Sequence, residues 1–225
     1  MRMPSDYSNT QKAQTLKLPV KKRRDYVAKA VAEYAGKVDL VMSYLESRGI
    51  RRDTAERWQL GFVETPLPGH EDFVGRLAIP YLTPAGPLCL KFRCVEPHDC
   101  KATGCVKYLG EPNENRLFGV WNFRHDDPVI HICEGELDAI VATQTGLRAV
   151  GIPGASSWRP YWDHLFEGYD EVVLLRDGDA AGRKMSENLQ GRLPNCRTVK
   201  MPEGHDVSSF VMANGGDALR ERIQV

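Results

Sequence analysis

Apolar positions in the second half of the chain form short continuous runs that alternate with segments of helical spacing. The apolar runs are 129–133, 149–152, 171–175 and 197–201, and the helical segments include 137–145 and 180–193. Continuous apolar strands separated by helices are typical of a parallel sheet that is covered on both faces. We therefore predict an α/β domain over residues 127–212, with a C-terminal tail over residues 213–225.

The first half of the chain mixes helical and strand patterns. Apolar residues recur at helical spacing from Tyr26 to Ser47, which predicts two helices separated near Gly36. Two later apolar runs, 75–82 and 88–95, are joined by a short turn that contains Gly and Pro. That pattern indicates a β-hairpin. The expected fold class is thus α/β: an α+β subdomain followed by a parallel-sheet domain.

The break at Asp126-Asp127-Pro128 marks the expected boundary between the two parts. We assign residues 26–126 to the first subdomain and residues 1–25 to a basic, mobile lead-in. Residues 1–126 hold 20 Lys and Arg against 15 Asp and Glu, whereas residues 127–225 hold 10 against 15. This asymmetry favours an anion-binding surface beside a cation-binding one, although charge counts also fluctuate this much without a function.

The polar N-terminus and the short apolar runs bear on location. No apolar run reaches the roughly 18 residues of a membrane span, and the first residues lack the apolar core of a secretory signal. We expect a cytoplasmic protein with no membrane association, in the bacterial host cytoplasm if a phage encodes it.

Acidic residues follow two of the predicted strands at the point where each strand ends. Glu134 comes directly after the first strand, with Asp138 next on the following helix, and Asp177 and Asp179 follow the strand 171–175. Residues beyond the carboxyl ends of parallel strands converge on one crevice, where ligands bind. Four carboxylates in one place repel each other unless a cation lies between them. Carboxylate oxygens are ligands that suit Mg²⁺ or Mn²⁺. The alternative, a helix N-terminus and a separate turn, does not explain why both clusters occupy matching strand ends.

The cysteines raise a second metal hypothesis, which their spacing disfavours. Cys89 and Cys94 are separated by four residues, as are Cys100 and Cys105, with His98 between the pairs. Zinc sites more often use pairs separated by two residues. Cys89 and Cys94 also lie on a predicted strand, where a separation of five places them on opposite faces. We favour thiols in a core strand and a loop, and we do not expect zinc in this chain.

Both acidic motifs resemble the Toprim domain of primases and topoisomerases. They are Glu134-Gly135-Glu136-Leu137-Asp138-Ala139 and Asp177-Gly178-Asp179-Ala180-Ala181-Gly182. Shorter motifs extend the resemblance, in order, to the core of the bacterial DnaG-type primase from about residue 40 to 212. The segments that carry it are 44–50, 58–63, 75–80, 92–93, 107–109, 117–120 and 201–206.

The resemblance implies roles for individual side chains. It implies that the catalytic metal ions are held by Glu134, Asp177 and Asp179. Two further acids, Asp138 and Asp206, would support these ligands or share the ions. The implied basic groove for template and nucleotide phosphates is lined by Arg76, Arg93, Lys107 and Arg116. One departure concerns the last motif, where Ser208 occupies the place of the family's second Asp.

The implied function is a DNA primase core, of a kind that some bacteriophages encode, which makes short RNA primers for replication. Its partners would be single-stranded DNA, nucleoside triphosphates, a replicative helicase and a separate zinc-ribbon polypeptide, because the chain shows no zinc ribbon and no P-loop. Two alternatives remain: a metal-dependent Toprim nuclease, and a nucleic-acid-binding accessory subunit of a helicase–primase.

Overall fold

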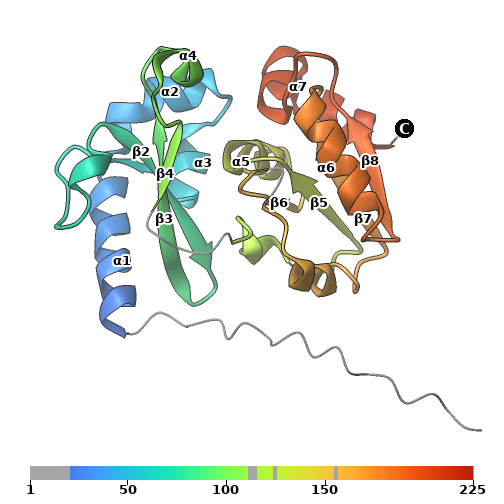
Figure 1. Cartoon of the computed structure of the whole chain (residues 1–225), viewed down its shortest axis with the longest axis horizontal. Helices are drawn as coiled ribbons and strands as arrows, with labels where there is room; N and C mark the ends of the chain where they lie inside the picture. Colours follow the sequence, from blue (N-terminus) through green and yellow to red (C-terminus); the bar gives the residue numbers. More distant parts are fainter. Residues whose placement is uncertain (1–20, 111–115, 124–125, 155–156, 225) are drawn as a thin grey trace, which may run out of the picture.

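The structure is a computed structural model that describes residues 21–110, 116–123, 126–154 and 157–224. It contains two four-stranded sheets, whose arrangement Figure 1 shows. The first sheet has the order β1-β2-β3-β4 with antiparallel pairs, and the second has the order β6-β5-β7-β8 with parallel pairs. This arrangement confirms the predicted fold class.

The N-terminal part packs helices against its antiparallel sheet. Its elements are α1 (Lys21–Ala35), η1 (Val38–Val41), α2 (Met42–Ser47), α3 (Arg52–Arg57), β1 (Gly61–Phe62), η2 (Glu71–Phe73), β2 (Arg76–Thr83), β3 (Gly86–Cys94), α4 (Cys100–Thr103), β4 (Tyr108–Gly110) and η3 (Val120–Asn122). The apolar face of α1, which includes Val27, Val31 and Tyr34, packs on Phe92 of β3. Because helical spacing gathers these residues on one face, the sequence favours a helix there.

The C-terminal part is a parallel sheet between two helical layers (Figure 1). Its elements are β5 (Val129–Cys133), α5 (Glu136–Gln144), β6 (Ala149–Gly151), η4 (Pro160–Leu165), β7 (Glu171–Arg176), α6 (Ala180–Gln190), β8 (Cys196–Lys200) and α7 (Val207–Gln224). Alternate residues of β7 enter different apolar clusters: Val173 packs with residues of α5 and α7, and Leu174 with residues of α6. Burial on both faces explains why these strands read as continuous apolar runs.

One apolar cluster joins the two parts. It contains Trp58 and Tyr81 from the first part together with Cys133 and Leu137 from the second. Phe118, from the connecting segment, stacks on Trp58 with ring centroids 4.8 Å apart. The two sheets therefore share a core, which fixes the relative position of their edges.

Three local features differ from the sequence expectations. Helix α1 begins at Lys21, inside the expected lead-in, of which residues 1–20 lie outside the described part. Helix α4, which begins at Cys100, lies where the cysteines after the strand were expected to occupy a loop. Helix α7 continues to Gln224, across the segment 213–225 that was expected to be a tail. Within the described segments, no helix is long and apolar enough to cross a membrane.

The continuation of α7 has a physical reason. Phe210, Leu219 and Ile223 are buried and pack into the shared core, so this helix covers part of the sheet. Gly215 interrupts it with φ 86° and ψ 164°, a conformation that only glycine adopts readily. The two adjacent glycines obscured the helical pattern in the sequence.

Candidate active site

The two acidic clusters meet at the carboxyl edge of the parallel sheet. Cys133 and Leu175 are paired in register, so the residues that follow β5 and β7 lie side by side. The backbone N–H of Asp177 donates a hydrogen bond of 3.1 Å to Oε1 of Glu134. A pocket of about 310 Å³ opens here, and its acidic lining residues are Glu134, Glu136, Asp138, Asp177 and Asp206. The topology thus brings together acids that are far apart in the sequence.

Two glycines allow the acidic loops to approach each other closely. A Cβ atom at Gly182 would lie 2.3 Å from Oε1 of Glu134, and one at Gly178 would lie 2.3 Å from the carbonyl oxygen of Pro202. Asp179 accepts a 2.9 Å hydrogen bond from the N–H of Gly182 and so caps the N-terminus of α6. Its side chain is exposed, and it is not among the residues that line the acidic pocket.

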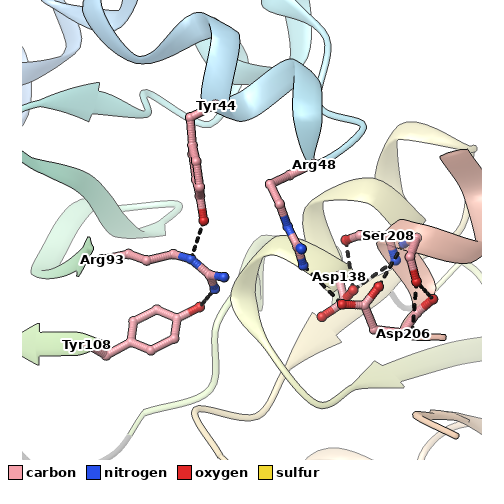
Figure 2. Close-up of polar contacts among 8 residues, drawn as sticks. Tyr44, Arg48, Arg93, Tyr108, Asp138, Asp206 and Ser208 are labelled. Carbon is pink, nitrogen blue, oxygen red and sulfur yellow. Dashed lines mark hydrogen bonds and ion pairs between the residues drawn. The ribbon is translucent and has the colours of Figure 1, made fainter. Parts of the chain in front are cut away.

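Asp138 and Asp206 are held by different partners (Figure 2). Oδ1 of Asp138 accepts hydrogen bonds from the backbone N and from Oγ of Ser208, at 2.9 and 2.7 Å. Asp206 accepts a 2.7 Å bond from the N–H of Ser209 and forms an ion pair of 3.0 Å with Arg48 of the N-terminal part. Both carboxylates are therefore fixed in position before any ligand binds.

Burial and mutual repulsion perturb the pKa values of these acids. Burial raises the pKa of Glu134 to about 7, and the charges of Asp179 and Asp138 add to the effect. Burial raises the pKa of Asp177 to about 8, with repulsion from Asp138 and Glu134 as further causes. Burial and the charge of Asp206 also raise the pKa of Asp138. Perturbed carboxyl groups that share a pocket are typical of functional sites.

The pKa of Asp206 moves in the opposite direction. Burial disfavours its charge, but hydrogen bonds from Ser209 and the positive charge of Arg48 outweigh burial and lower the pKa. Among the acids that line the pocket, Asp206 is thus paired with Arg48, as Glu136 is paired with Lys91.

The acidic donor set fits a divalent metal ion. Oδ1 of Asp177 is buried and has no hydrogen-bond partner among the described residues. A buried carboxylate oxygen without a donor is costly, and coordination of a cation would satisfy it. Oxygen donors of this number and charge suit Mg²⁺ or Mn²⁺, which retain water ligands and bridge to phosphates.

Basic side chains form the opposite wall of the same pocket. They are Arg48, Lys91, Arg93 and Lys107. Arg93 is only 9% exposed, and its guanidinium donates to the hydroxyl groups of Tyr44 and Tyr108 (Figure 2). Burial, together with the charges of Arg93 and Arg48, lowers the pKa of Lys107. Cations that crowd each other in this way would bind phosphate groups favourably.

The other two predicted basic residues lie elsewhere. Arg76 donates a 2.8 Å hydrogen bond to the carbonyl oxygen of Val106 and is not part of the lining of the acidic pocket. Arg116 lines a separate, largely apolar pocket of about 240 Å³ together with Tyr161 and Leu165. The structure thus brings Arg93 and Lys107 to the acids, and it keeps Arg76 and Arg116 apart from them.

Several residues of the pocket were not singled out from the sequence. Arg48, Lys91, Tyr44 and Tyr108 belong to this group. The signal for three of them was present, because Tyr44 and Arg48 lie within the motif 44–50 and Tyr108 within the motif 107–109, both of which carry the family resemblance. No sequence motif pointed to Lys91. Its place in the pocket depends on a 2.8 Å contact with Glu136, which forms only when helix α5 packs beside the antiparallel sheet.

Comparisons with known proteins agree with this geometry. A family model described as Toprim-like matches residues 131–211. The Gene 57 protein of Mycobacterium phage D29 is 42% identical over 121 residues, which cover 53% of this chain and 80% of that protein. A DNA primase of Pseudomonas aeruginosa is 34% identical over 134 residues, which cover 52% of this chain. The match spans only 20% of that primase.

A solved structure matches over a longer range. A DNA primase domain from Pseudomonas aeruginosa superposes with a TM-score of 0.72 at 26% identity, covering 89% of this chain and 78% of that domain. The similarity therefore includes the antiparallel sheet as well as the parallel one.

Proposed function

The chain belongs to the DnaG-type primase family, whose core carries a Toprim domain, and we propose that it synthesises short RNA primers on a single-stranded DNA template. The observation that carries this proposal is the single pocket in which metal-binding acids face Arg48, Arg93 and Lys107. Nucleotidyl transfer needs both: acids to hold cations and bases to hold phosphates. A nuclease needs the acids as well, but the basic wall of this pocket and the DNA primase relatives favour synthesis.

The acids supply the metal site of the proposed reaction. Glu134, Asp177 and Asp179 would hold Mg²⁺, with Asp138 and Asp206 supporting or sharing the ions. When bound, such ions would activate the primer 3′-hydroxyl and neutralise charge on the leaving pyrophosphate. Ser208 keeps Asp138 in position, and the 3.0 Å pair with Arg48 keeps Asp206 ionised.

The basic wall has a positioning role. Tyr44 and Tyr108 fix the guanidinium of Arg93, so little conformational entropy is lost when it binds a phosphate. Lys107, on the same wall, supplies a second positive charge. Contacts to phosphates orient template and nucleotide without reading base sequence.

The proposed partners follow from the reaction. They are single-stranded DNA and nucleoside triphosphates, with a replicative helicase and a separate zinc-ribbon polypeptide as further candidates. The match covers about a fifth of the DNA primase relative, so activities of that whole protein extend to this chain only as proposals.

One assay distinguishes the proposal from its alternatives. Purified chain is incubated with single-stranded DNA, labelled nucleoside triphosphates and Mg²⁺ or Mn²⁺, and the products are separated on a denaturing gel. Labelled oligoribonucleotides that depend on template and metal support the primase. Metal-dependent loss of DNA without oligomers indicates the nuclease, and DNA binding without either product indicates the accessory subunit.

A further inference from the structure

Three cysteines and one histidine meet beyond the end of β3, outside the acidic site. One donor atom from each of Cys94, His98, Cys100 and Cys105 lies within 4.8 Å of the others. Sγ of Cys94 and Nε2 of His98 are 3.7 Å apart. We propose that these four residues form a structural zinc site that orders the connection between β3 and β4.

The distances suit a tetrahedral ion. Zinc binds sulfur at about 2.3 Å and nitrogen at about 2.0–2.1 Å, so two donors on one tetrahedral edge are roughly 3.5–3.8 Å apart. The Cys94–His98 pair already has this separation. The other donors would need to move by about 1 Å. Three thiolates and an imidazole are a common structural zinc set, and soft sulfur ligands disfavour Mg²⁺.

Local structure delivers each ligand to the same place. Cys94 ends β3, where it pairs in register with Arg76. Cys100 begins α4, and Asp99 caps that helix by accepting a 2.9 Å bond from the N–H of Lys101. Gly104 then reverses the chain with φ 71° and presents Cys105 toward the others. The site is built from consecutive elements of one connection.

The connection lacks an apolar core of its own. No residue from 95 to 106 is buried, and all of these residues lie in the described part of the chain. Holding each residue in place costs roughly 1–2 kcal/mol of backbone entropy. Zinc binding free energy stabilises small segments that cannot bury enough apolar surface. A metal ion therefore explains why so exposed a segment folds back on itself.

Pairwise spacing concealed this ligand set in the sequence. The spacing argument paired Cys89 with Cys94, but Cys89 packs in the apolar core beside Tyr81 and is not among the four donors. The actual order is Cys94, His98, Cys100 and Cys105, which no pair of cysteines reveals. The proposed ligand set differs from that pairing because it leaves out Cys89 and includes His98.

The site adjoins the basic wall of the acidic pocket. A neighbouring groove of about 570 Å³ is lined by the four donors and also by Arg48, Arg93 and Lys107, which line the acidic pocket too. Lys107 follows Cys105 by two residues, and Arg76 binds the carbonyl oxygen of the intervening Val106. Three thiolates on Zn²⁺ leave one net negative charge, which the guanidinium of Arg76, 4.0 Å from Sγ of Cys105, offsets. The proposed ion would therefore hold Lys107 in place.

The first test is metal content. The full chain, purified under reducing conditions without chelator, should contain about one zinc ion per chain by mass spectrometry. Cys100→Ser and Cys105→Ser should each retain at least tenfold less. Cys196→Ser, a change at a half-buried thiol outside the cluster, should retain the full amount. Cobalt substitution should give the intense visible bands of a tetrahedral site and thiolate charge-transfer absorption.

Two results would overturn the proposal. One is wild-type protein with less than about a tenth of an equivalent of zinc that also gives no tetrahedral cobalt spectrum on titration. The other is equal loss of zinc from Cys196→Ser, which would indicate adventitious binding by thiols.

A second measurement needs no variant and no enzymatic activity. Removal of zinc from the wild-type chain should raise amide hydrogen exchange by about tenfold or more in residues 95–107 and leave residues 129–133 unchanged. Unchanged exchange in both segments would contradict a structural role. Because neither readout involves primer synthesis, failure here is distinguishable from failure of the proposed function.

Discussion

Ser208 donates two hydrogen bonds to one oxygen of Asp138, from its hydroxyl at 2.7 Å and from its backbone N–H at 2.9 Å. Ser208 is fully buried, and Asp138 is 8% exposed. In the related family this position usually holds a second Asp. The neutral hydroxyl stabilises a buried carboxylate where a second charge would repel it. The departure from the family motif therefore has a local structural role.

Substitution of Ser208 by Asp should make stability depend on metal. In Ser208→Asp, two buried carboxylates share one site, which should lower the free energy of unfolding by about 1–3 kcal/mol at pH 8 without metal. Each kcal/mol corresponds to a Tm change of about 2–4 °C at this size. Ser208→Asn is the matched uncharged control. Addition of Mg²⁺ should bring the Tm of Ser208→Asp to that of Ser208→Asn. Equal Tm values of these two variants without metal would contradict this account.

Stability of the metal-free protein should fall as pH rises. The folded-state pKa values of Glu134 and Asp177, about 7 and about 8, lie above the ordinary values near 4. A raised pKa means that the fold favours the protonated acid, so this stabilisation is present at low pH and is lost by about pH 8. Thermal unfolding in chelator should show Tm decreasing from pH 5 to 8.5. Asp177→Asn should flatten the profile, and a wild-type Tm that rises over this interval would be incompatible with the assignment.

Loss of the Lys107 charge should weaken DNA binding in a salt-dependent way. If Lys107 neutralises one phosphate, Lys107→Ala should reduce affinity for single-stranded DNA by about 3–10-fold and reduce the slope of log affinity against log salt by about 0.7. Lys184→Ala, on the exposed face of α6, is the control. Fluorescence anisotropy at several salt concentrations measures both quantities. Identical slopes of log affinity against log salt for the two variants would show that Lys107 does not contact a DNA phosphate.

The contact between helix α5 and the antiparallel sheet should be energetically coupled. Glu136 is 2% exposed, and its Oε1 accepts hydrogen bonds from Tyr81 at 2.6 Å and from Lys91 at 2.8 Å. Glu136→Leu leaves the Lys91 charge unpaired and should cost about 3–5 kcal/mol in urea denaturation. The double variant with Lys91→Met should recover at least half of that loss. Equal stability of Glu136→Leu and wild type would show that the pair is not coupled.

The sequence predicted the parts of the molecule that depend on local pattern. Strand β5 was expected at 129–133, where it is found, because a strand buried on both faces is continuously apolar. Strand order then explains why Glu134 and Asp177 meet. Helix α7 escaped prediction because Gly215 and Gly216 interrupt its pattern and only tertiary packing stabilises it.

Side chains that act between the N-terminal and C-terminal parts were the hardest to predict. Arg48 and Asp206 are far apart in the sequence, and nothing local indicates their 3.0 Å contact. The proposed zinc ligands were considered and set aside on their spacing, for a related reason. His98 and Cys105 become neighbours only through the turn at Gly104, which depends on a short helix with no buried residues.

The most direct test of the central claim is primer synthesis by a chain that lacks one metal-binding carboxylate. Wild type, Glu134→Gln and Glu187→Gln are compared for template-dependent oligoribonucleotides in Mg²⁺ after circular dichroism has verified their folding. Glu187 is exposed on α6 and controls for the loss of a charge. We expect Glu134→Gln to lose about 100-fold or more of the activity and Glu187→Gln to retain it. Full activity of a folded Glu134→Gln would contradict the proposed site.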